Sequence, residues 1–106
     1  MTGDADSVRA ALRRDLVTAM KTRDSAHVAA LRTAIAAIDN AESVDAEEVT
    51  AIEVARRELS ADEVHAVLAA HVHGYAVEAD GYDAVGQPGP AERLRRQAAL
   101  LRPYLL

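Results

Sequence analysis

The sequence contains no cysteine, no tryptophan and no phenylalanine, and tyrosine appears only three times. The lack of cysteine excludes a disulfide framework, a thiolate metal site and a cysteine nucleophile. The lack of tryptophan and phenylalanine argues against an aromatic surface on which nucleic-acid bases would stack. These absences remove several common classes of enzyme and binding protein.

Long apolar runs are also absent. No stretch approaches the roughly 18 consecutive apolar residues of a membrane-spanning helix. The first seven residues are acidic, whereas a signal peptide begins with a basic segment. We therefore expect a cytoplasmic protein that does not contact membranes.

The apolar half of the chain consists largely of small side chains. Alanine supplies 24 of the 106 residues, and leucine, isoleucine and valine together supply another 24. This length suits one small domain, so residues 1–106 are interpreted as a single unit.

Apolar residues recur every three or four positions, which is the spacing of one helix face. The first stripe contains Val8, Leu12, Leu16 and Met20, and the second contains Val28, Leu31, Ile35 and Ile38. Residues 22–25 interrupt the pattern and supply side chains that can cap a new helix. The short connection favours an antiparallel pair of helices.

The third helix has the sharpest start signal. Ser60 and Glu63 have the spacing of a capping box, and Leu59 and Val64 flank it as a hydrophobic staple. We expect a helix over residues 61–85, about 35 Å long. Its apolar stripe contains Val64, Leu68, His71, Tyr75, Ala79 and Tyr82.

Residues 86–90, with the sequence GQPGP, predict a turn, and Pro90 suits the first position of a fourth helix. Leu94, Ala98 and Leu101 would form its buried face, and Pro103 would end it. Residues 44–58 are expected to form a flexible linker or a short helix. No segment alternates as a strand does, so the sequence predicts an all-α bundle of about four helices, with a long third helix and no sheet.

Charge is distributed unevenly along the chain, whose net charge is -5. Residues 36–92 carry a net charge of -11, whereas residues 8–35 and 93–106 each carry +4. The basic residues expected on outward faces are Arg14 and Lys21 on the first helix, Arg32 on the second, and Arg93 and Arg96 on the fourth. If the first and fourth helices are neighbours, these side chains form a cationic strip suited to RNA phosphates. The alternative is an ordinary solvated surface.

Histidine does not have the spacing of a metal site. Successive steps between His65, His71 and His73 turn a helix by about 240° and 200°, so His71 shares a face with neither of the other two. His71 lies in the apolar stripe, where we expect a buried or half-buried side chain bonded to a tyrosine or to a backbone carbonyl. Ser7, Ser25 and Ser60 are interpreted as helix caps, and no glycine-rich phosphate loop is present. The sequence therefore predicts no metal site, no catalytic residue and no cofactor.

A second hypothesis treats the third helix as a docking surface. His71, Tyr75 and Tyr82 would present an exposed stripe to a protein partner or to a second copy of the chain, independently of RNA. This interpretation and the RNA-binding one remain open at the level of sequence.

Several short segments occur in the order typical of one protein family. They are LVTAMK at 16–21 with Arg23 and Asp24, Leu31 and Arg32, IAAIDNAE at 35–42, LSADEV at 59–64, AVGQ at 84–87 and LLRPYL at 100–105. On these segments the chain resembles the YqeY/GatB-tail family, and the resemblance extends over roughly residues 12 to 105, with 44–58 outside it. Members of this family resemble the tail of the GatB subunit of tRNA-dependent amidotransferases.

The resemblance implies a helical bundle and a link to glutamine-dependent carbon–nitrogen ligation on tRNA. It covers the N-terminal helical domain, and we expect the C-terminal tail domain to be missing because the sequence ends at Leu106. The resemblance therefore implies a tRNA-binding or protein-binding accessory protein without an active site of its own. A third hypothesis, direct help in amidating a charged tRNA, has no candidate residues.

Overall fold

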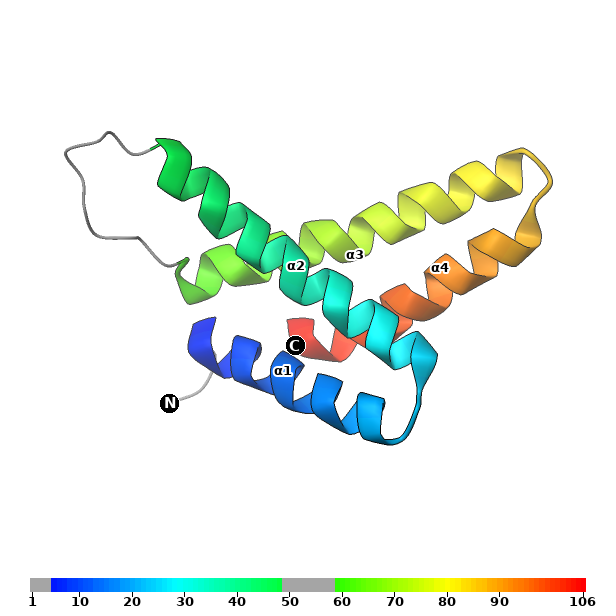
Figure 1. Ribbon diagram of the computed structural model, residues 1–106. Helices are drawn as coiled ribbons and strands as arrows, with labels where there is room; N and C mark the ends of the chain where they lie inside the picture. Colours follow the sequence, from blue (N-terminus) through cyan, green and yellow to red (C-terminus); the bar gives the residue numbers. More distant parts are fainter. Residues whose placement is uncertain (1–4, 49–58) are drawn as a thin grey trace.

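The computed structural model describes residues 5–48 and 59–106, which form four α-helices and one 3-10 helix with no strand among them (Figure 1). The helices are α1 (Ala5–Lys21), α2 (Ser25–Glu48), α3 (Ala61–Ala84) and α4 (Pro88–Leu101), followed by η1 (Arg102–Leu105). The predicted all-α fold with a long third helix is confirmed. No helix in this part of the chain is long and apolar enough to cross a membrane.

The second helix is longer than its apolar stripe predicts. Residues 44–48, expected to belong to a linker or a short separate helix, continue α2 to Glu48. The helix is rich in alanine and contains neither glycine nor proline, so nothing in its sequence stops it after Ile38. Residues 49–58, the rest of that expected segment, lie outside the described residues.

The start of α3 agrees with the prediction in detail. The backbone N–H of Glu63 donates to Ser60 Oγ at 3.1 Å, and the backbone N–H of Ser60 donates to Glu63 Oε1 at 2.8 Å. Leu59 and Val64, the flanking apolar pair, are both buried. The capping box satisfies two polar groups that a helix start would otherwise leave unpaired.

The fourth helix begins two residues earlier than predicted, at Pro88 instead of Pro90. The turn is therefore confined to residues 85–87, where Gly86 adopts a φ of 76°. Both prolines lie in the first turn of α4, where backbone N–H groups have no partner inside the helix and their loss carries no penalty. The α-helix ends at Leu101, two residues before Pro103, as predicted.

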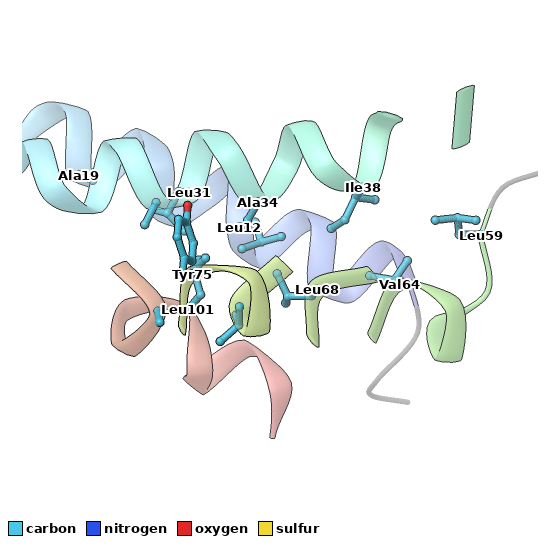
Figure 2. Close-up of a cluster of buried hydrophobic side chains, with 13 residues drawn as sticks. Leu12, Ala19, Leu31, Ala34, Ile38, Leu59, Val64, Leu68, Tyr75 and Leu101 are labelled. Carbon is cyan, nitrogen blue, oxygen red and sulfur yellow. The ribbon is translucent and has the colours of Figure 1, made fainter. Parts of the chain in front are cut away.

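The two helical hairpins pack across one another. In Figure 1 α1 and α2 form one antiparallel pair, α3 and α4 form the other, and α2 crosses both helices of the second pair. The largest fully buried side chains come from all four helices: Leu12, Leu31, Ile38, Val64, Leu68 and Leu101 (Figure 2). Several alanines are also fully buried, among them Ala30, Ala34, Ala79, Ala91 and Ala98. Their small side chains let the helices approach closely.

A buried ion pair joins the first two helices. Arg9 of α1 donates to Glu42 Oε2 of α2, and the two side chains are 10% and 8% exposed. The same carboxylate oxygen accepts the backbone N–H of Leu59 at 3.1 Å. Glu42 therefore connects α1, α2 and the residue that leads into α3, a role that the sequence pattern did not reveal.

The C-terminal end is held against the bundle by two polar contacts. The Tyr104 hydroxyl donates to Asp15 Oδ2 of α1, and His65 Nε2 of α3 donates to the Leu105 carbonyl at 3.0 Å. Burial, together with the hydrogen bond to Asp15, raises the pKa of Tyr104 well above its ordinary value. The phenol therefore stays protonated as a donor throughout the physiological range.

Candidate nucleic-acid interface

A groove lies between the first turns of α2 and the middle of α4. It has a volume of about 320 Å³ and is lined by Ser25, Ala26 and Ala29 of α2 and by Arg93, Arg96 and Gln97 of α4. We call it the α2–α4 groove. Figure 1 shows the beginning of α2 passing beside α4, and these two helices are in direct contact. On the α2 side the groove is lined by small side chains, and no acidic side chain lines it.

The polar side chains of this groove have no partner within the described protein. Arg93, Arg96, Gln97 and Ser25 form no side-chain hydrogen bond or ion pair with any described residue. The two guanidinium groups are exposed, and Gln97, one turn after Arg93, is half-buried. Glu92 and Arg96, one turn apart on α4, form no ion pair with each other. The groove thus presents two cations and several hydrogen-bond donors to a ligand.

A second cavity, of about 230 Å³, provides a useful contrast. It is lined by Asp15, Thr18, Ala19, Thr22, Asp24, His27 and Tyr104. Its polar groups are bonded within the protein: Tyr104 to Asp15, the two threonine hydroxyls to carbonyls of α1, and His27 Nδ1 to Asp24 at 2.7 Å. Hydrogen bonds from the His27 backbone and side chain lower the pKa of Asp24. These groups cap a helix and hold η1, so the α2–α4 groove is the stronger ligand site.

Most basic side chains of the described residues form no ion pair. Residues 7–43 and 59–106, whose side chains are described, contain ten lysine and arginine residues and ten acidic residues. Four of the basic side chains form ion pairs there: Arg9, Arg13, Arg14 and Arg95. The six without an ion pair in that part of the chain are Lys21, Arg23, Arg32, Arg93, Arg96 and Arg102. At a cation without an ion-pair partner, no carboxylate of the protein competes with an anionic ligand.

Of the five residues predicted to bind RNA, only two line the groove. Arg93 and Arg96 line the α2–α4 groove. Arg32 is exposed on α2, one turn beyond the groove residue Ala29, and Lys21 ends α1 four residues before Ser25. Arg14 lies outside the groove, on the outward side of α1, with Nε 3.4 Å from Asp15 Oδ1.

The predicted strip along adjacent first and fourth helices is not the observed arrangement. The main neighbours of α4 are α3 and α2, and α1 packs on α2 and to a lesser extent on α3. The cause is the crossing of the two hairpins, which places α2 between the basic faces. The sequence periodicity of each helix does not determine that crossing.

Tyr75 and His71 of α3 form internal contacts, so the three predicted residues do not make one exposed stripe. Tyr75 is 9% exposed and belongs to the core, with its hydroxyl 2.7 Å from Thr33 Oγ1 of α2. His71 is half-buried, packs edge-on against the Tyr75 ring at 4.8 Å, and has Nε2 3.3 Å from the same threonine oxygen. Of the three predicted partner-binding residues, only Tyr82 is exposed, at 38%. The partner of His71 is thus Thr33, where a tyrosine or a carbonyl was expected.

The burial of His71 leads to a testable pH dependence. Burial lowers the pKa of His71 below its ordinary value of 6.5. The unfolded chain therefore binds this proton more readily than the folded one, so stability is highest above about pH 6.5 and decreases as the pH falls through the lowered value. We expect the midpoint of thermal unfolding to decrease from about pH 7 to pH 5 in the wild type. His71→Gln should weaken this dependence, whereas His73→Gln, on the exposed side of α3, should leave it unchanged; equal slopes in all three proteins would contradict the expectation.

The described residues contain no group of three or more histidine, aspartate or glutamate side chains placed to hold a metal ion.

Sequence reasoning missed two residues of the groove. Ser25 was interpreted as a cap, yet Asp24 performs that role by accepting the His27 backbone N–H at 3.2 Å. The only sequence signal for Gln97 was its position four residues after Arg93.

The chain was compared with models of known protein families and with curated proteins, and it matches none of them.

Proposed function

We propose that this protein is an RNA-binding accessory protein that holds the phosphate backbone of tRNA in the α2–α4 groove. The observation that carries the proposal is that Arg93 and Arg96 line this groove without an acidic partner in the described protein. Guanidinium groups donate in pairs to phosphate oxygens, and such contacts supply most of the sequence-independent affinity for nucleic acids. The resemblance to the YqeY/GatB-tail family is the reason for choosing tRNA among RNAs. The proposal assigns no reaction to this chain.

Two other free cations would extend this surface. Arg32 lies on α2 three residues after the groove residue Ala29, and Lys21 ends α1 four residues before Ser25. A backbone that crosses the groove would pass from α4 towards these residues. The groove is lined by small side chains and contains no aromatic ring, so recognition would depend on the sugar-phosphate backbone and not on stacked bases.

An equilibrium titration with total tRNA at low and moderate salt tests the proposal. Binding should be strongest near about 50 mM salt and should weaken steeply as salt rises. The Arg93→Ala/Arg96→Ala variant should lose about 10-fold in affinity for each phosphate contact removed, and the slope of log K against log salt should decrease by about 2.

A matched control removes the same charge elsewhere. Arg13 lies beside Asp39 on the α1–α2 side, and Arg102 lies in η1; both are exposed and outside the groove. The Arg13→Ala/Arg102→Ala variant should bind tRNA nearly as well as the wild type. No binding by the wild type near 50 mM salt, or equal losses in the two double variants, would exclude the proposed site.

A further inference from the structure

We infer that Gln97 reads the ribose 2′-hydroxyl, so that the α2–α4 groove prefers RNA to DNA. This inference rests on the proposed function and adds the type of nucleic acid that the groove selects. It begins from the chemistry of the lining residues. The two arginines only donate hydrogen bonds, and phosphate groups are common to RNA and DNA, so Arg93 and Arg96 cannot tell the two polymers apart.

Two lining side chains can both donate and accept. They are the amide of Gln97 and the hydroxyl of Ser25, and neither has a hydrogen-bond partner in the described protein. A 2′-hydroxyl is itself a donor and an acceptor, which makes an amide with a carbonyl and an NH₂ group a complementary partner. A half-buried amide without a partner favours a ligand that supplies one.

The different exposure of the arginines and of Gln97 indicates which part of an RNA backbone each would contact. Arg93 and Arg96 are exposed, whereas Gln97 is half-buried on the side of α4 that faces α2. Phosphates held by the arginines would lie at the rim, and the sugar between them would face the interior. The opposite wall consists of Ala26 and Ala29, whose methyl groups leave room for a ribose. The sugar edge is therefore the part of the backbone placed to meet Gln97.

The test compares single-stranded RNA and DNA oligonucleotides of one sequence, with the full chain, near about 50 mM salt where phosphate contacts are strong. The wild type should bind the RNA about five-fold more tightly, which is the effect of one neutral hydrogen bond. Gln97→Leu should abolish this preference by weakening RNA binding while leaving DNA binding unchanged. Gln87→Leu, in the exposed turn before α4, is the matched control and should retain the preference.

A second measurement does not depend on a variant that folds. A 2′-O-methyl RNA of the same sequence cannot donate from its sugar and carries an additional methyl group, so the wild type should bind it more weakly than the unmodified RNA. Equal binding of RNA and DNA by the wild type, or a preference that survives in Gln97→Leu, would overturn the inference and leave the proposed function standing. If the wild type binds neither polymer, the proposed function fails and the inference with it.

Discussion

Replacing Glu42 with alanine is expected to lower the free energy of unfolding by about 3–5 kcal/mol. The change removes the carboxylate that faces buried Arg9 and the acceptor of the Leu59 backbone N–H. Removing one partner of a buried pair costs more than the pair contributes, because the remaining charge stays in a poorly solvated place. A domain of this size has only about 5–15 kcal/mol of stability, so the effect should be large. Urea unfolding followed by far-ultraviolet circular dichroism measures it.

Two further variants separate the causes. Asp39→Ala breaks the long contact between Arg13 and Asp39, 3.9 Å apart with both side chains more than half exposed, and should cost less than about 1 kcal/mol. The apolar double replacement Arg9→Met/Glu42→Leu should recover much of the stability lost in Glu42→Ala, because no buried charge is left without its partner. If Glu42→Ala were no less stable than Asp39→Ala, the bridging role of Glu42 would be wrong.

The second large effect is expected at Leu68, in the middle of α3. Its side chain is 1% exposed and belongs to the core cluster that includes Leu12, Leu31 and Leu101. Leu68→Ala removes buried apolar surface and leaves a cavity, which should lower the free energy of unfolding by about 2–5 kcal/mol.

The matched control is Val77→Ala on the same helix. Val77 is 57% exposed, so its loss should change stability by no more than about 0.5 kcal/mol. The same urea titration compares both variants with the wild type. Similar losses at Leu68 and Val77 would mean that α3 does not present the face described here to the core.

Features of the fold that depend on neighbouring residues were predictable. The start of α3 follows from Ser60 and Glu63, which contact each other within one turn. The end of α4 follows from Pro103 for a similar local reason. The start of α4 was predicted two residues late because both Pro88 and Pro90 fit a first turn, and the sequence alone does not choose between them.

Features that depend on the crossing of the hairpins were not predictable. Thr33 meets Tyr75 across 42 residues of sequence, and Arg9 meets Glu42 across 33. The α2–α4 groove likewise joins Ser25 to Gln97, and the arginine pattern identified only part of it. Helical periodicity shows which residues of a helix face inward, but it does not show which other helix they meet. This is why the basic residues were correctly predicted to be exposed, whereas the neighbouring first and fourth helices that would have joined them into one strip are not observed.

The central claim is that RNA phosphates bind at the α2–α4 groove. The most direct measurement is a nuclear magnetic resonance titration of the isotope-labelled full chain with tRNA, recorded at low salt and again at higher salt. We predict that backbone amide signals shift for residues 25–29 and 93–97 and that these shifts diminish as salt rises. Shifts confined to η1 or to the exposed side of α3, or no shifts at low salt, would contradict the claim.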